Sequence, residues 1–306
     1  MSLVRRPALA LALALAFLGL GAPAAGARAQ PVNGRIAFLL AGGDTGDIDR
    51  MNPDGSCVRP LLAGPGDQES AAWSPNGRRL VFGVAGISLG LADADGTHKT
   101  VLTQRPGFVY WPSWSPHGNR IVYAGKPGQY QHKTQLYVIH PDRSGFRKLT
   151  DDPHGAFTPA WSPDGRWIAY GGRGISLVRP GGSLTRSLTH HESDVSPSWS
   201  PDGRRLAFTR IFEGGVRTDV FVVDRDGSGL TRLTRDGKSS WPVWSPDGSL
   251  IAFGRFSNGG GNGVFTMRPD GSGVTRLTSG PAGREVPLSW RALRPPTPSC
   301  RKPTSG

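Results

Sequence analysis

Short segments in which apolar side chains alternate with polar or small ones recur along the chain from residue 33 onward. Residues 205–208 (RLAF) are typical, and residues 220–223 (VFVV) show a fully apolar variant. Short segments of this kind, bounded by Gly, Pro and Asp, predict half-buried or buried β-strands. The 3.6-residue periodicity of a surface helix is absent from the sequence pattern, which therefore predicts an all-β fold.

One ten-residue motif introduces many of these strands and occurs five times. Its copies are WSPNGRRLVF from Trp73, WSPHGNRIVY from Trp114, WSPDGRWIAY from Trp161, WSPDGRRLAF from Trp199 and WSPDGSLIAF from Trp244. Pro-Asp-Gly predicts a tight turn, because Pro fixes φ and Gly accepts a left-handed conformation. The copies recur every 38 to 47 residues, which is the period of four-stranded blades in a propeller.

Each repeat also contains a second turn after its third strand, and most fourth strands end in Leu-Thr. The second turns are residues 52–55, 93–96, 141–145, 180–182, 224–227 and 269–271. We expect the Trp of the motif to lie on the innermost strand and to pack between neighbouring blades.

The count of these features predicts a ring with one composite blade. There are six second turns and six strand segments, because residues 33–38 (NGRIAF) match the end of the motif without its Trp. Residues 286–290 (VPLSW) supply the missing innermost strand. The sequence therefore predicts an all-β, six-bladed β-propeller of four-stranded antiparallel blades over residues 30–293. Pairing of the N-terminal strands with a C-terminal strand would close the ring and remove its open edges.

The two ends of the chain differ from the repeats. Residues 1–29 combine two arginines, an apolar run and a final Ala-Arg-Ala, which is typical of a secretory signal peptide. The apolar run at residues 8–20 is shorter than the about 20 residues of a membrane-spanning helix. We expect export to the periplasm or extracellular space, by the general secretory or the twin-arginine route, and no integral membrane segment after cleavage. Residues 294–306 predict an irregular tail rich in Pro and Ser.

Cys57 and Cys300 are the only cysteines. In an oxidising compartment a lone pair of cysteines most simply forms a disulfide. Cys57 follows the second turn of the composite blade, and Cys300 lies ten residues after Trp290. Ten residues of extended chain reach about 33 Å, so Cys300 can reach that turn. We predict a Cys57–Cys300 bond that locks the closure, and intact mass with and without reduction tests it.

The chain carries 36 Lys and Arg against 23 Asp and Glu, a net charge of +13. The positive residues are scattered through the repeats, so we expect no nucleic-acid partner. Weak attraction to anionic cell-surface polymers or lipid head groups is the expected consequence. We expect a monomer.

The repeated Trp-Ser-Pro-Asp-Gly, the strand after it, the second Asp-Gly turn and the final Leu-Thr resemble the repeat of the TolB-like propeller family. The resemblance covers nearly all of the chain after residue 29 and implies the propeller fold. One fold hosts many functions, so it implies function less directly. The member that gives the family its name is a periplasmic protein that binds a peptidoglycan-associated lipoprotein. That member has an extra domain before its propeller, and we expect no counterpart of the domain here.

Two motifs suggest chemistry but do not fit their context. Residues 86–90 (GISLG) match the G-x-S-x-G pattern of serine hydrolases, yet they lie where a third strand is expected and not before a helix. Residues 93–96 and 224–228 resemble calcium loops without the acidic residue that ends such a loop. We predict no catalytic residues, no cofactor and no enzymatic activity.

Histidines form a candidate metal site. His190 and His191 lie in one connection between blades, and His154 lies in the preceding connection. Neighbouring connections meet on one face, so these side chains could share a metal ion. Their spacing specifies no metal, and solvated loop residues are the simpler interpretation. A metal-assisted lyase or hydrolase using these histidines is the enzymatic alternative.

The loops and the connections between blades vary in length and are all expected on the face opposite the Pro-Asp-Gly turns. Function on a rigid scaffold usually lies on such loops. The aromatic and acidic residues near the innermost strands at this face are Tyr110, Trp111, Phe157, Trp241, Glu69, Asp194 and Glu285. We expect an exported binding module that recognises a protein partner or a cell-envelope glycan with these residues at the channel mouth. A purely structural envelope component, in which the rings only pack between blades, is the other alternative.

Overall fold

The computed structural model describes residues 32–41, 47–62, 70–103, 107–127, 133–212, 214–256, 262–278 and 284–293. The chain divides into two compact units, residues 1–30 and 31–306, and all described residues belong to the second. Regular structure in this described part consists of strands alone. Within it, no helix has the length and apolar character that crossing a membrane requires.

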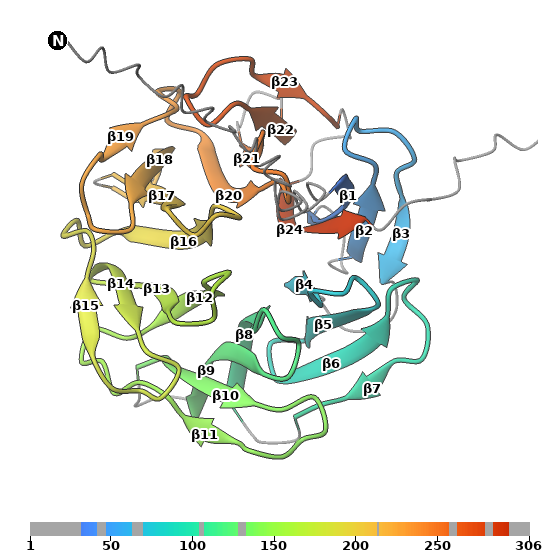
Figure 1. Cartoon of the computed structure of the whole chain (residues 1–306). Coiled ribbons are helices and arrows are strands. Elements are labelled where there is room, and N and C mark those ends of the chain that lie inside the picture. The colour runs from blue at the N-terminus through green and yellow to red at the C-terminus, as the bar shows by residue number, and fades with distance from the viewer. Residues whose placement is uncertain are drawn as a thin grey trace, which may run out of the picture. The chain divides into compact units, whose positions relative to one another are not determined.

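The strands form six four-stranded antiparallel sheets, which are the blades of a propeller (Figure 1). From the innermost strand outward, blade 1 is β24 (Arg284–Leu293), β1 (Val32–Ala41), β2 (Asp47–Met51) and β3 (Arg59–Leu62); blade 2 is β4 (Ala71–Trp73), β5 (Arg79–Val84), β6 (Ser88–Asp93) and β7 (Thr100–Val101); blade 3 is β8 (Gly107–Trp114), β9 (Ile121–Pro127), β10 (Gln135–Ile139) and β11 (Arg147–Lys148). Blade 4 is β12 (Phe157–Trp161), β13 (Ile168–Gly172), β14 (Gly174–Val178) and β15 (Thr185–Ser187); blade 5 is β16 (Asp194–Trp199), β17 (Arg205–Ile211), β18 (Thr218–Asp224) and β19 (Thr231–Arg232); blade 6 is β20 (Ser239–Trp244), β21 (Ile251–Arg255), β22 (Gly263–Met267) and β23 (Thr275–Arg276).

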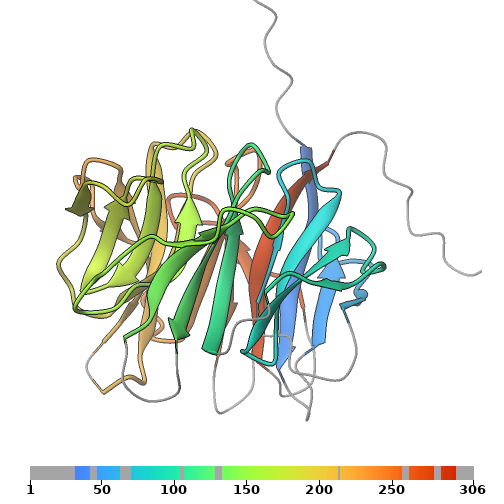
Figure 2. The same cartoon turned by 90° about the horizontal axis from the view of Figure 1, so that it is seen from below.

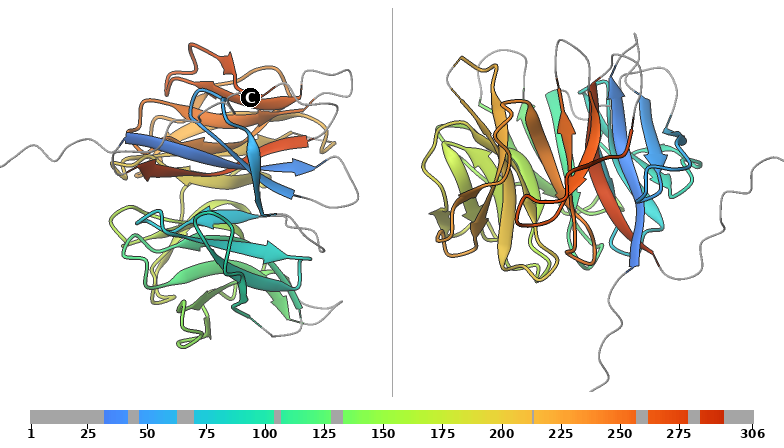
Figure 3. Two further views of the ribbon diagram at one scale, coloured as in Figure 1. Left: turned by 90° about the vertical axis from the view of Figure 1, so that its right-hand side faces the viewer. Right: turned by 90° about the horizontal axis from the view of Figure 1, so that it is seen from above.

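Blade 1 is the composite blade that the sequence predicted. Val32 of β1 pairs with Leu293 of β24, and Ala41 pairs with Arg284. Figure 3 shows these two strands, from opposite ends of the chain, side by side. The six-bladed, closed, all-β prediction is therefore confirmed. The predicted signal peptide, the tail and Cys300 lie outside the described residues, so the Cys57–Cys300 bond stays a prediction.

Six apolar clusters form the core, one between each pair of neighbouring blades. Each cluster contains one Trp of an innermost strand, and these are Trp73, Trp114, Trp161, Trp199, Trp244 and Trp290. All six side chains are at most 9% exposed. Removing a buried Trp side chain costs about 3–5 kcal/mol, so these residues hold neighbouring blades together, as predicted.

The other residues of the motif close its turns. In blade 5, Ser200 Oγ donates to Asp202 Oδ1 at 2.6 Å and accepts from Arg205 N at 2.9 Å. Blades 2, 4 and 6 repeat both bonds. The Thr of the Leu-Thr pair accepts from the third strand, as Thr103 Oγ1 does from Leu89 N at 2.9 Å. The repeated residues therefore stabilise the fold, and functional residues are expected at positions that differ between blades.

Hydrogen bonds between neighbouring innermost strands alternate around the ring. In blades 3, 5 and 1 a Ser Oγ accepts from the backbone N of the next blade's Trp, at 3.2 to 3.3 Å; these are Ser113, Ser198 and Ser289. The Trp residues of the next blades leave Nε1 without a partner among the described residues: Trp161, Trp244 and Trp73. In blades 3 and 5 the Trp Nε1 instead donates to a carbonyl of the preceding blade at 3.1 Å. In blade 1 the Nε1 of Trp290 donates to Gly34 O of its own blade at 2.9 Å. The Ser bonds therefore repeat every two blades, whereas the indole bonds to the preceding blade occur only in blades 3 and 5.

The ring has two different faces because successive strands of each blade run in opposite directions (Figure 2). In blades 2 to 6 the two hairpin turns, after the first and third strands, lie at one face, which we call the hairpin-turn face. Blade 1 has only the second of these turns, because its first strand, β24, comes from the other end of the chain. The loops between second and third strands and the connections between blades lie at the other, the variable-loop face. Each innermost strand begins at the variable-loop face, so its first residues surround that mouth of the central channel.

Candidate functional site at the channel mouth

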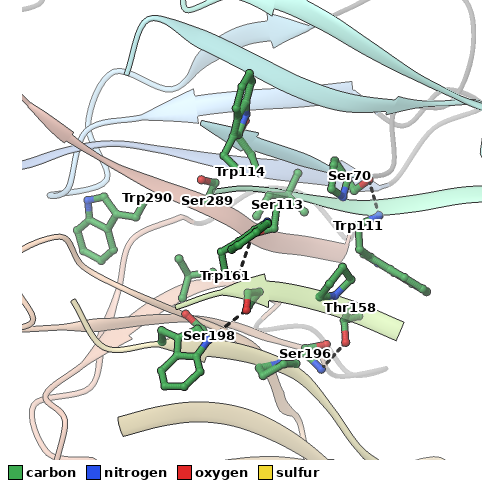
Figure 4. Close-up of a pocket in the computed structure, with 18 of the residues that line it drawn as sticks. Ser70, Trp111, Ser113, Trp114, Thr158, Trp161, Ser196, Ser198, Ser289 and Trp290 are labelled. Atoms are coloured by element: carbon green, nitrogen blue, oxygen red, sulfur yellow. Dashed lines mark hydrogen bonds between the residues drawn. The ribbon is translucent and has the colours of Figure 1, made fainter. Parts of the chain in front are cut away.

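A cavity of about 310 Å³ lies in the central channel and is lined by all six innermost strands (Figure 4). Trp, Pro and Ser side chains make up most of its wall. Pro75 and Pro163, from the hairpin turns, line one end, and Trp111 and Trp241 line the cavity toward the variable-loop face. The mouth on that face is therefore bordered by the aromatic residues that the sequence singled out.

Four innermost strands share one form of β-bulge near this mouth, and β24 has a register shift of its own opposite Ala37 and Phe38. The register shifts fall between Tyr110 and Ser113, Phe157 and Ala160, Val195 and Ser198, and Ser240 and Val243. Inside each bulge one residue has positive φ: Trp111 (52°), Thr158 (48°), Ser196 (56°) and Trp241 (56°). A proline follows each of them and cannot donate to the strand ladder, which favours a bulge at this point. A bulge re-aims its side chain, and here it does so around the channel.

The backbone at Trp111 and Trp241 is strained. A left-handed conformation brings Cβ close to the following carbonyl oxygen, at a cost of about 1–2 kcal/mol for a residue other than glycine. Buried hydroxyl groups of the preceding blade hold this conformation: Trp111 N donates to Ser70 Oγ at 3.2 Å, and Trp241 N donates to Thr209 Oγ1 at 2.9 Å. Strain of this kind persists where the surroundings fix it and is concentrated at functional sites.

Five aromatic side chains form a continuous contact chain at the mouth, which we call the aromatic bridge. Trp111 of blade 3 and Trp241 of blade 6 have ring centroids 6.3 Å apart, although these blades are on opposite sides of the ring. Phe157 meets Trp111 edge-on at 6.4 Å. On the other side Tyr110 lies 5.3 Å from Trp111, and Phe108 stacks on Tyr110 at 6.1 Å. The bridge thus spans the channel from blade 3 to blade 6.

The β5–β6 loop packs closely against the bridge at a glycine. Gly86 has a φ of +63°, and a Cβ there would lie 2.7 Å from the Tyr110 hydroxyl. This glycine begins the G-x-S-x-G motif, whose Ser88 is the first residue of strand β6. At the other end of the motif, a Cβ on Gly90 would come within 2.4 Å of the Phe82 ring. Both glycines therefore pack closely against aromatic rings, which explains the motif without a catalytic role for its serine.

The acidic residues predicted for the mouth are bonded within the fold. Asp194 is fully buried, and Arg210 donates to both of its oxygens at 2.7 and 2.8 Å. Thr189 Oγ1 also donates to Asp194 at 2.7 Å. Glu285 is 4% exposed and accepts from the hydroxyl of Thr278. Both carboxylates thus tie an innermost strand to the Leu-Thr segment of the preceding blade.

The histidines of the candidate metal site have separate surroundings. His154 and His190 are exposed. His191 is half-buried, with Nδ1 3.7 Å from Asp194 Oδ1. Across the described ranges, no group of three or more His, Cys, Asp and Glu side chains is placed to hold a metal ion. Glu69, the remaining predicted residue, lies outside the described residues.

Sequence reasoning found four members of the aromatic bridge but missed Phe108 and the positive-φ positions. A signal for the latter was present. Four copies of the motif read residue-Pro-residue-Trp, as in residues 111–114 (WPSW) and 241–244 (WPVW). The pre-proline residue is the one that adopts positive φ, and in two blades it is a Trp.

Comparisons with known proteins agree with this fold. The profile of the TolB beta propeller domain matches residues 84–289. TolB from Acinetobacter baumannii is 18% identical, with a TM-score of 0.72 over 84% of this chain and 66% of that chain. A putative TolB from Agrobacterium tumefaciens is 20% identical, with a TM-score of 0.68 over 86% of this chain and 99% of that chain.

A likeness to an enzyme was also found. An oligogalacturonate lyase in complex with manganese is 15% identical, with a TM-score of 0.58 over 80% of this chain and 74% of that chain. At identities of 15 to 20%, these structures show a shared fold and no more. No curated protein matches the sequence significantly.

Proposed function

The chain belongs to the TolB beta propeller domain family, and we propose that it is an exported, non-enzymatic binding module. Its ligand would be a protein partner or a cell-envelope glycan, held at the variable-loop face. The pattern of the first 29 residues supports export to the periplasm or extracellular space, and we propose that the protein acts as a monomer. The observation that carries the binding role is the aromatic bridge across the channel mouth.

Physical properties of the bridge suit recognition. Four of its rings are half-buried and Phe108 is exposed, so each presents apolar surface to solvent. The backbones of Trp111 and Trp241 are held by hydrogen bonds to buried hydroxyl groups. Rigid aromatic side chains supply large contact area at low cost in conformational entropy, which is why they dominate binding hot spots. Apolar side chains of a peptide, or the C–H faces of a sugar ring, can pack on such a surface.

Affinity capture from envelope extract tests the proposal. The bait proteins are the wild type, the double variant Trp111→Ala/Trp241→Ala, and the control Trp167→Ala. Trp167 is a half-buried Trp next to a hairpin turn, under the guanidinium of Arg179, so it controls for loss of a Trp elsewhere. Captured proteins are identified by mass spectrometry and glycans by composition, and direct titration of the captured species follows.

We expect one species to bind the wild type and Trp167→Ala and to be lost with the double variant, because the bridge rings are gone. Equal capture by all three proteins, or capture by none, would show that the bridge only packs the channel and would refute the proposal. Circular dichroism of each variant confirms that it is folded.

The fold likeness to a manganese-bound oligogalacturonate lyase favours one alternative, a metal-assisted lyase or hydrolase using His154, His190 and His191. Elemental analysis of the purified protein, with an assay for cleavage of oligogalacturonate, distinguishes it. Stoichiometric metal that is lost with His190→Ala/His191→Ala, together with turnover, would replace the binding proposal by the enzymatic one.

A further inference from the structure

Four arginines cross blade 1, one from each of its strands, near the hairpin-turn face; we call them the arginine row. They are Arg291 on β24, Arg35 on β1, Arg50 on β2 and the first residue of β3, Arg59. Arg50 is directly opposite Arg59 and opposite Ala37, two residues after Arg35. Ile36 and Trp290 are paired and pack toward blade 6. Because side chains alternate along a strand, the row projects from the other side of the blade, toward blade 2.

Two members of the row depart from the repeat. The residues in the other blades that match the register position of Arg50 are Leu91, Val138, Leu177, Val222 and Thr266, all buried. Arg291 follows the innermost Trp, where the other blades have the Ser that closes the hairpin turn. Blade 1 thus replaces an apolar core position and a turn residue by arginines. A break in an otherwise consistent pattern is expected at functional sites.

The guanidinium groups repel one another. No member of the row forms an ion pair with a described carboxylate. Burial and the charges of Arg35 and Arg50 lower the pKa of Arg291 to about 10. Burial and Arg35 also lower the pKa of Arg50, with a smaller contribution from Arg59, while Asp95 acts in the opposite direction.

Arg291 is held in place without using all of its donors. Its guanidinium lies 4.8 Å from the centre of the Trp73 ring, and one terminal nitrogen donates to Gly77 O at 3.0 Å. Its Nε is buried and has no hydrogen-bond partner among the described residues. A buried donor of a charged group is costly to leave unbonded. An oxyanion between blades 1 and 2 would accept from it and offset the repulsion along the row.

We propose that the arginine row is a binding site for a phosphate group, on the face opposite the proposed ligand-binding mouth and independent of it. Guanidinium groups bind phosphate through paired, charge-assisted hydrogen bonds, and several of them around one anion suit its three or four oxygens. The phosphate can belong to a small soluble molecule or to a phospholipid head group, and the two sources are separated by experiment.

The test compares the wild type, Arg50→Leu and Arg204→Leu. Arg50→Leu introduces the residue type that blade 2 has at this register position, Leu91. It should fold, with a higher melting temperature in phosphate-free buffer because one of four mutually repelling charges is removed. Arg204 is an exposed arginine at a hairpin turn of blade 5 and controls for loss of one charge on the same face. Calorimetric titration with inorganic phosphate is run against sodium chloride at equal ionic strength. Sedimentation is run with phosphatidylcholine vesicles with and without phosphatidylglycerol.

We expect phosphate or the phosphatidylglycerol vesicles to bind the wild type and Arg204→Leu. Binding to Arg50→Leu should be weaker by about tenfold or more, because a charge-assisted contact is lost. Binding of phosphate alone would identify a soluble ligand, and binding of vesicles alone a lipid head group. Equal affinity of wild type and Arg50→Leu, an equal loss in Arg204→Leu, or no binding beyond the chloride and phosphatidylcholine controls would overturn the proposal.

Discussion

Replacing Trp241 by Gly should leave the protein more stable than replacing it by Ala, although both variants lose the same ring contacts. Trp241 has a φ of 56°, a conformation that costs Ala about 1–2 kcal/mol and Gly almost nothing. Gly loses more chain entropy on folding, about 0.5–1 kcal/mol relative to Ala. At the mid-points of these two ranges Gly is favoured by about 0.75 kcal/mol. For a domain of this size, that is a melting temperature higher by about 1–4 °C.

Val243, two residues along the same strand, provides the control. It lacks the positive φ of Trp241, so Val243→Gly should be less stable than Val243→Ala by about 0.5–1 kcal/mol. Urea denaturation of the four variants, followed by tryptophan fluorescence, gives both differences. The prediction is therefore a reversal of sign between two neighbouring positions. If Gly is the worse residue at both, the backbone of the aromatic bridge is not strained, and the argument that it is a pre-formed binding surface loses its physical basis.

Three further predictions follow from buried and charged groups. Arg210→Ala should destabilise the protein by about 3–5 kcal/mol, because it leaves the fully buried carboxylate of Asp194 without its charged partner; chemical denaturation measures the loss. Trp199→Phe should cost about 1 kcal/mol more than Trp73→Phe, because the Nε1 of Trp199 donates a hydrogen bond and the Nε1 of Trp73 has no partner among the described residues. Asp202→Asn should make stability less sensitive to acid, measured as melting temperature between pH 6 and pH 3.

The sign of the acid effect follows from the pKa of Asp202. Burial is the largest influence and raises it, but bonds from Ser200 and from the Arg204 amide, with the charges of Arg204 and Arg205, lower it below 3.8 in net. The ionised form therefore stabilises the fold above pH 3.8, and this contribution is lost as the pH falls through the lower folded value. An identical acid profile for Asp202→Asn would contradict the reasoning. A neutral Arg210→Ala, or equal costs for the two Trp→Phe variants, would contradict the other two predictions.

The repeat made the fold readable from sequence, because turns, strand segments and the isolated VPLSW could be counted and matched. The mouth was readable only in part. Trp111 and Trp241 are 130 positions apart, and their contact depends on the diameter of the closed ring and on two bulges, which no local pattern specifies. Asp194 was expected to face a ligand, yet the structure gives its carboxylate to Arg210. The position of Asp194 at the start of an innermost strand does not tell whether its carboxylate faces the channel mouth or is buried in the fold.

The alternating hydrogen bonds of the innermost strands have a consequence for the parity of the ring. Ser occupies the position before the innermost Trp in blades 1, 3 and 5, and Ala or Val occupies it in blades 2, 4 and 6. An odd number of blades cannot alternate, because two strands of the same kind would meet at one seam. Loss or gain of a single blade would therefore disrupt a seam, whereas a block of two consecutive blades could be added or removed with every seam intact. In this chain, the smallest unit that preserves the alternation of the serine bonds is a pair of consecutive blades.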